Sequence, residues 1–79
     1  MPIFHLNIST RTTVIPDEEG SELADLDAAR REAIMDARAL MSAAILQGRD
    51  ISHRQIEICD ADGDLLMEVP FSEAYELGD

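Results

Sequence analysis

The longest periodic segment of the chain is residues 26–47, with the sequence LDAARREAIMDARALMSAAILQ. Apolar residues recur in it every three or four positions, which places them on one side of an α-helix. This apolar stripe consists of Leu26, Ala29, Ala33, Ala37, Leu40, Met41, Ala44 and Ile45. Asp25 is a good N-cap residue, Asp27 complements the helix dipole, and Gly48 fits the left-handed position after a helix. We therefore predict one helix over about residues 26–47, lying close to the surface that covers its alanines.

The residues before this helix have the pattern of a short hairpin. Residues 3–8 are apolar at every second position, which is typical of a half-buried strand. Residues 12–15 are all β-branched and predict a second strand, and Pro16 ends it because proline has no N–H for the ladder. Residues 9–11 are a plausible turn, and residues 17–22 are predicted to be a loop.

The residues after the helix predict a second hairpin. Residues 55–59 and 65–71 alternate between apolar and other side chains, and residues 60–63 supply the Asp and Gly of a turn. Residues 72–77 are expected to add a short turn or helix.

This order predicts an α+β fold in a single domain, residues 1–79, because 79 residues suffice for one core. The antiparallel sheet has the order β-β-α-β-β, with the long helix on one face in two layers. Leu66, Ile3 and Val14 are expected on the uncovered face. A chain this short buries only roughly 60–65% of its unfolded surface, so we expect a homo-oligomer, a dimer.

The charge balance excludes several classes of function. The chain has 17 acidic residues against six arginines, no lysine, and a net charge of −11. Nucleic acid and anionic membranes would repel such a chain, so we expect no direct nucleic-acid partner and no membrane association. A signal peptide and an apolar run of about 18–20 residues are missing from the sequence, and Cys59 is the one cysteine, which favours a cytoplasmic location.

Two groups of charged residues are candidates for binding a protein partner. The acidic loop before the helix contains Asp17, Glu18, Glu19 and Glu22, and its carboxylates suit contact with a basic surface. Arg30 and Arg31 lie off the apolar stripe, and arginine is the charged residue most favoured in interfaces.

The sequence contains no constellation typical of catalysis, so we expect no catalytic residue, no metal site and no cofactor. The Asp60–Asp64 run resembles a calcium loop, but Leu65 and Phe71 stand where that loop needs glycine and glutamate. His5 and His53 could lie near each other if their strands pair, which leaves a small metal-dependent enzyme as an alternative.

Four motifs together resemble a family of short alphaproteobacterial proteins, common in rhizobia and known as a domain of unknown function. They are Phe4-His5, the Asp17-Glu18-Glu19-Gly20 loop, the Asp25–Arg30 helix start and Val69-Pro70-Phe71. The resemblance covers nearly the whole chain and implies the fold boundaries, but no activity. Members of that family often carry an acidic, glycine-containing hairpin where this chain has residues 9–13. Residues 23–37 also resemble the helix start of HicB-type antitoxins.

These observations favour a small acidic protein that acts as a protein–protein interaction module, through a protein partner that the sequence does not identify. The two acidic blocks, before the helix and after residue 47, favour a second hypothesis. In it the chain is an acidic regulator, antitoxin-like or a nucleic-acid mimic, that binds a basic partner. The metal-dependent enzyme is the third.

Overall fold

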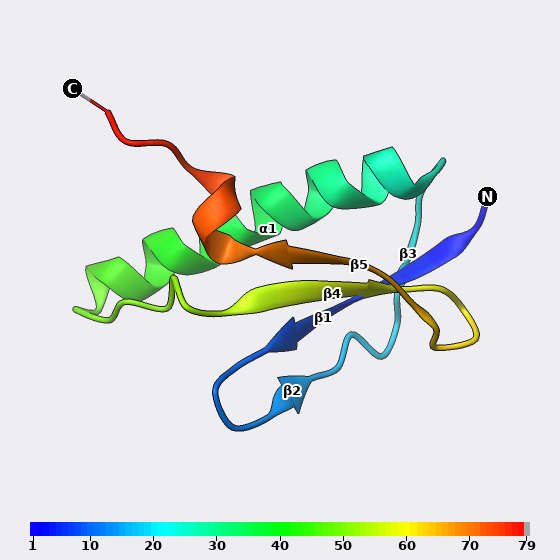
Figure 1. The fold of residues 1–79 in the computed structure, drawn as a ribbon, viewed down its shortest axis with the longest axis horizontal. Helices are drawn as coiled ribbons and strands as arrows, with labels where there is room; N and C mark the ends of the chain where they lie inside the picture. Colours follow the sequence, from blue (N-terminus) through cyan, green and yellow to red (C-terminus); the bar gives the residue numbers. More distant parts are fainter. Residues whose placement is uncertain (79) are drawn as a thin grey trace.

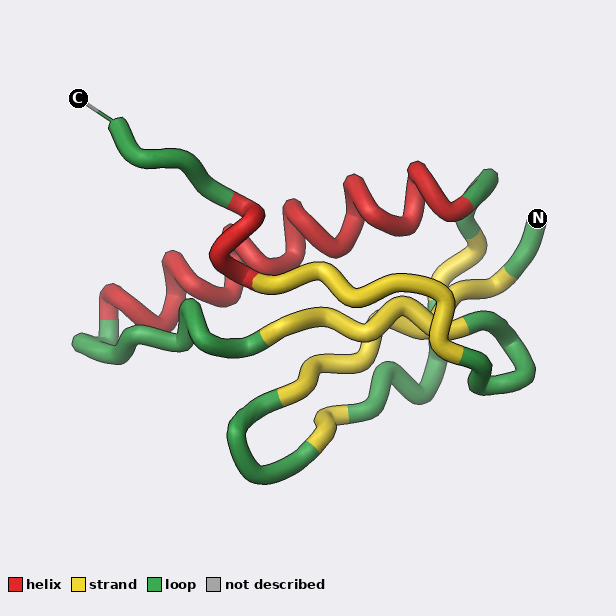
Figure 2. Tube along the Cα trace, in the orientation of Figure 1, coloured by secondary structure: helices red, strands yellow, loops and turns green. Residues whose placement is uncertain are grey.

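The computed structural model describes residues 1–78 (Figures 1 and 2). The elements along the chain are β1 (Ile3–Ser9), β2 (Val14–Ile15), β3 (Ser21–Glu22), α1 (Leu26–Leu46), β4 (Gln55–Cys59), β5 (Leu65–Pro70) and the 3₁₀ helix η1 (Phe71–Ala74). The strands form one antiparallel sheet in the order β2-β1-β4-β5, and β3 also pairs with β1. The predicted α+β class, the single long helix and the antiparallel sheet are confirmed. The predicted order of elements lacked β3.

The outer edge of β1 is covered by two short strands and one side chain. β2 pairs with β1 at Ile8, and β3 pairs with it at Phe4. The backbone N–H of Leu6, which lies between them, donates to Asp17 Oδ2 at 3.1 Å. Gly20 N–H donates to the other oxygen of the same carboxylate at 3.2 Å. The prediction of a loop over residues 17–22 was therefore wrong for β3, because a two-residue strand has no periodicity to detect.

Both ends of α1 are capped by the residues that the sequence marks. Asp25 Oδ1 accepts the N–H of Ala28 at 2.8 Å. At the other end Gly48 has a φ of 80°, its N–H donates to the Ile45 carbonyl, and Arg49 N–H donates to the Ala44 carbonyl. This pair of hydrogen bonds is a Schellman motif, which satisfies the last carbonyls of the helix and turns the chain away from its axis.

The core lies between the alanine-rich side of α1 and one face of the sheet. Its fully buried members include Ala29, Ala33 and Ala37 from the helix and Ile56, Ile58 and Val69 from the strands. Alanine has the smallest apolar side chain, so the helix backbone lies close to the sheet. Phe71 and Ala74 of η1 complete the core beside the helix.

The predicted apolar stripe of the helix is only partly buried. Leu40 is 38% exposed and Ile45 is 63% exposed. A helix of 21 residues is about 31 Å long at about 1.5 Å per residue. The five residues of β4 cover only about 17 Å. The last turns of α1 therefore run past the end of the sheet, as Figure 1 shows.

The opposite face of the sheet is polar and is partly covered by the segment before β3. His5 Nδ1 hydrogen-bonds to the Asp17 carbonyl oxygen at 2.6 Å, and Asn7 Oδ1 accepts the Asp17 N–H at 2.8 Å. Asn7 Nδ2 lies 3.6 Å from the sulfur of Cys59, which is buried. Ile3 and Leu66 are exposed, at 39% and 43%.

The turns follow the local chemistry. In the second hairpin, Asp60 accepts at its carbonyl from Gly63 N–H, and Gly63 has a φ of 88°. The first hairpin turns over Thr10 to Thr13, which are joined by a 2.8 Å backbone hydrogen bond, one to two residues later than predicted. Within residues 1–78 no helix combines the length and the hydropathy needed to cross a bilayer.

Candidate functional site

A groove of about 440 Å³ lies where α1 runs past the sheet. The last turns of the helix form its floor, the loop after the helix forms one wall, and the residue after η1 forms the other. Its lining residues are Arg38, Met41, Ser42, Ile45, Arg49, Asp50, Ile51, Ser52 and Tyr75. The volume is in the range of sites that take a small ligand or an anchoring side chain of a partner.

Three local features of residues 48–52 hold one wall of the groove in place. The Schellman motif at Gly48 turns the chain back over the helix. Ile51 is 7% exposed and fixes the following loop to the core. Within that loop, Ser52 N–H donates to Asp50 Oδ1 at 2.8 Å. Hydrogen bonds from the Ser52 backbone and hydroxyl lower the pKa of the Asp50 carboxyl, because they stabilise its charged form.

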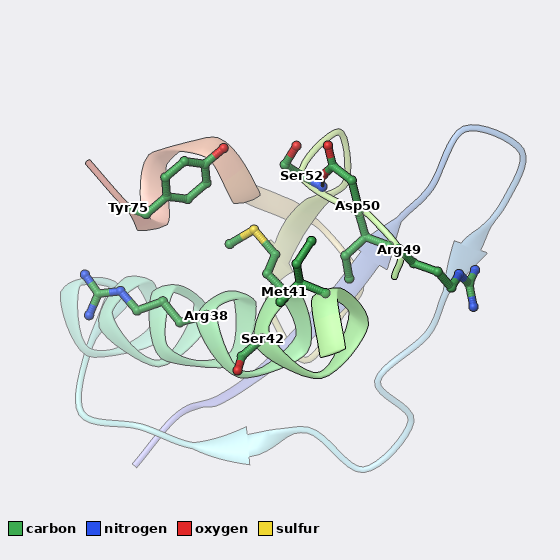
Figure 3. A pocket seen from close by; sticks show the side chains of 9 residues that line it. Arg38, Met41, Ser42, Arg49, Asp50, Ser52 and Tyr75 are labelled. Atoms are coloured by element: carbon green, nitrogen blue, oxygen red, sulfur yellow. Dashed lines mark hydrogen bonds between the residues drawn. The ribbon is translucent and has the colours of Figure 1, made fainter. Parts of the chain in front are cut away.

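The second wall is attached to the helix by an arginine. Arg38 Nε donates to the carbonyl oxygen of Ala74 at 2.6 Å, which joins the middle of α1 to the end of η1. Ala74 is fully buried, and the next residue, Tyr75, faces the groove and is 52% exposed. Figure 3 shows Met41 pointing up from the helix between Tyr75 and the loop.

The groove has an apolar floor and a cationic rim. Ile45 is 63% exposed and Met41 half-buried, so the floor presents aliphatic surface to solvent. The guanidinium groups of Arg38 and Arg49 lie at opposite ends and point away from the centre (Figure 3). Among the residues that line the groove, Arg38 and Arg49 are positive and Asp50 is negative, which gives the lining a charge of +1 against −12 for the rest of the chain. The groove is thus the cationic part of an acidic molecule.

The sequence pattern does not indicate this groove, because its periodicity places Met41 and Ile45 on the apolar stripe and nothing in it marks Tyr75. A comparison of lengths would have found it. Residues 26–47 predict a helix about 33 Å long. The strand expected over residues 55–59 spans only about 17 Å. The sheet is therefore too short to cover the C-terminal part of the apolar stripe, which contains Met41 and Ile45.

The predicted partner-binding residues differ in exposure and in the contacts that they make. Asp17 is directed into the fold, where its carboxylate accepts backbone N–H groups of β1 and of the loop. Glu18, Glu19 and Glu22 are exposed. On the helix, Arg31 is exposed and Arg30 is half-buried. None of these six residues lines the groove.

The acidic loop lies near other carboxylates on the first half of α1. Burial raises the pKa of the Asp36 carboxyl, and the negative charges of Glu32 and Asp17 raise it further. The Asp17 carboxylate is therefore close enough to Asp36 for the two charges to repel each other, and we call Asp17, Glu18, Glu19, Glu22 and Asp36 the acidic region.

The two histidines do not form a site. His5 pairs with Cys59, at one end of the β1–β4 ladder, whereas His53 precedes the residue that pairs at the other end. The expectation that strand pairing could bring them together was wrong, because the two strands are antiparallel. Among residues 1–78, no three His, Cys, Asp or Glu side chains are grouped as metal ligands.

Comparison with known proteins gives one result that agrees with the fold boundaries. The chain matches the family described as "Domain of unknown function (DUF6894)" over residues 3–72. This stretch runs from the start of β1 to η1 and so includes every strand and the helix. No curated protein and no solved structure gives a significant match. Because the match covers most of its length, the chain belongs to the DUF6894 family of domains of unknown function.

Proposed function

We propose that the chain is a protein–protein interaction module and that the groove over the last turns of α1 is its binding surface. The observation that carries this proposal is the concentration of exposed apolar side chains at one concave, cationic place. Within the groove, Ile45 is 63% exposed and Tyr75 52%, and Met41 between them is half-buried. Contiguous exposed apolar surface with a polar rim is typical of sites that bind another protein.

The chemistry of the groove indicates the kind of segment that it binds. An aliphatic or aromatic side chain of the partner fills the space over Met41 and Ile45. Carboxylates that flank this anchor pair with Arg38 and Arg49 at the two ends. The apolar contact supplies most of the affinity, and the arginines select an acidic segment over a basic one.

Site-specific photo-crosslinking in the source organism tests this function. A photoreactive amino acid replaces Ile45 in the groove, and in a matched variant it replaces Leu66, which is 43% exposed on β5. We expect a defined cross-linked protein band with the position-45 probe and none with the position-66 probe. No adduct at position 45, or equal adducts at both positions, would contradict the proposal.

The acidic region supports a second candidate function, an acidic regulator that covers the basic surface of a partner. Glu18, Glu19 and Glu22 are all exposed there. A partner bound by these charges is released steeply as salt increases, because the Debye length shortens to about 3 Å at 1 M. Replacing the three glutamates by glutamine should abolish such a salt-sensitive complex and leave cross-linking at position 45 unchanged.

A further inference from the structure

We propose that the groove is filled by the segment from Tyr75 to Gly78 of a second copy of this chain, so that two copies exchange these segments. The proposal rests on the proposed function of the groove and names its occupant. Tyr75, the first residue of the segment, lines the groove. After it the chain leaves the body of the domain, as Figure 1 shows. Leu77 is 101% exposed, which means that its side chain is not covered by its own chain.

The chemistry of the segment complements that of the groove. Leu77 is an aliphatic anchor of the size that the apolar floor takes, and it follows Glu76 directly. The segment from Tyr75 to Gly78 carries one acid and no base, a charge of −1. The charged residues that line the groove, Arg38, Arg49 and Asp50, sum to +1. We assign a partner's Glu76 to Arg49 at one end of the groove, because the Nε of Arg38 at the other end already donates to the Ala74 carbonyl and holds that guanidinium against its own chain.

The position of the segment makes the exchange symmetric. Because each segment starts at the wall of its own groove, a two-fold axis beside Tyr75 directs it into the groove of the other copy. Such an isologous contact closes on itself and yields a dimer rather than a filament. Leu77 is the second residue beyond Tyr75, so an extended chain carries it about 7 Å from the groove wall, at about 3.3–3.6 Å per residue. Each copy then buries the apolar surface that it leaves exposed alone.

The first test is the mass of the full chain in solution, measured by sedimentation velocity over a wide range of concentration. We expect the wild type to have twice the mass of the 8.7 kDa chain at high concentration. Leu77→Asp should be monomeric over the same range, because the anchor becomes a charge. Leu66→Asp places the same charge on another exposed leucine and should remain a dimer. Circular dichroism of both variants should match the wild type, since both side chains are exposed.

Charge reversal tests the pairing of segment and groove. Arg49→Glu and Glu76→Arg should each weaken the dimer by about tenfold or more, because each reversal turns an attraction into a repulsion at two equivalent places. The double variant should recover most of the wild-type dissociation constant. A double variant no tighter than the singles would overturn the assigned pairing.

The outcomes separate this inference from the proposed function. A wild type that stays monomeric, or a Leu77→Asp variant that stays dimeric, overturns the exchange of segments. Position 45 would then still cross-link a different protein if the groove is a binding surface. If the dimer is lost in Leu66→Asp and kept in Leu77→Asp, the copies meet through β5 and the inference is wrong.

Discussion

Replacing Gly20 by alanine should destabilise the fold more than the same change at Gly48, and the difference measures how closely the acidic loop lies against β1. Both glycines have a positive φ, 72° and 80°. A Cβ at position 20 would lie 2.7 Å from Ile3 Cγ2, 3.0 Å from His5 Cε1 and 3.1 Å from the Phe4 carbonyl oxygen. A Cβ at position 48 would have no described atom within 4 Å apart from its chain neighbours.

The two substitutions share one energetic contribution and differ in another. The left-handed backbone costs an alanine about 1–2 kcal/mol at either position. Crowding of packed atoms typically costs about 1–3 kcal/mol, and it applies to position 20 only. The free energy of unfolding should therefore fall by about 2–5 kcal/mol for Gly20→Ala and by about 1–2 kcal/mol for Gly48→Ala. In a domain of this size each kcal/mol lowers Tm by about 4–8 °C.

Thermal and urea unfolding followed by far-UV circular dichroism measure both losses. Stiffening of the unfolded chain by alanine is similar at the two positions and cancels in the comparison. Adding Ile3→Ala to Gly20→Ala should return part of the lost stability, because it removes the atom nearest the new Cβ. Equal losses at positions 20 and 48 would refute the close packing of this loop against β1.

Three further predictions concern ionisable side chains. Asp17→Ala should lower the free energy of unfolding by about 1–3 kcal/mol, because two backbone N–H groups lose their acceptor. It should also speed amide exchange at Leu6, and a Leu6 amide that still exchanges slowly would contradict this. Glu19→Ala, the control, should change the free energy of unfolding by less than about 0.5 kcal/mol. Asp36→Asn should raise Tm at neutral pH. Burial raises the pKa of the Asp36 carboxyl above its ordinary 3.8. The charged carboxylate therefore destabilises the folded state at neutral pH, and this destabilisation disappears when the carboxyl is protonated at lower pH. The gain should shrink as the pH falls through the raised pKa toward 3.8, and a gain that grows in acid would exclude this cause. Burial also raises the pKa of the Cys59 thiol, so iodoacetamide should label Cys59 more slowly in the folded chain than in urea, as measured by mass spectrometry; equal rates would show that the thiol is accessible.

The elements that follow from local chemistry could be predicted from the sequence. The helix was placed at residues 26–47 and is found at Leu26–Leu46, because Asp25 and Gly48 specify its ends through hydrogen bonds close in sequence. The Asp60 turn follows in the same way from one side chain that accepts the N–H groups of Asp62 and Asp64.

The elements that depend on distant partners could not be predicted. β3 exists because the edge of β1 extends beyond β2 and offers pairing to Ser21. A shift of register between Ile58 and Cys59 alters the pairing at the start of β5, where Leu65 is 51% exposed although its neighbour Leu66 was the residue expected on the uncovered face. Neither the pairing of β3 nor the register shift produces a periodic pattern of apolar residues in the sequence.

The candidate site was hidden for a related reason. Hydrophobic periodicity identifies the side of a helix that is apolar, but it does not show how much of that side another element covers. Ala33 and Ile45 belong to one stripe, yet the first is fully buried and the second is 63% exposed. The acidic loop shows the opposite difference between sequence and structure. Its sequence suggests that Asp17 is a solvated surface charge, but the Asp17 carboxylate accepts two backbone N–H groups and so holds the loop against β1.

The covered edge of β1 has a consequence for aggregation. A strand edge with a continuous row of free donors and acceptors is a template for strands of other chains. Here β2 pairs at Ile8, β3 pairs at Phe4, and the Asp17 carboxylate accepts the N–H of Leu6 between them. A foreign strand approaching this edge meets a negative charge in place of a backbone donor. One carboxylate thereby acts as a gatekeeper against amyloid-like growth, at the point where both neighbouring strands are too short to close the edge themselves.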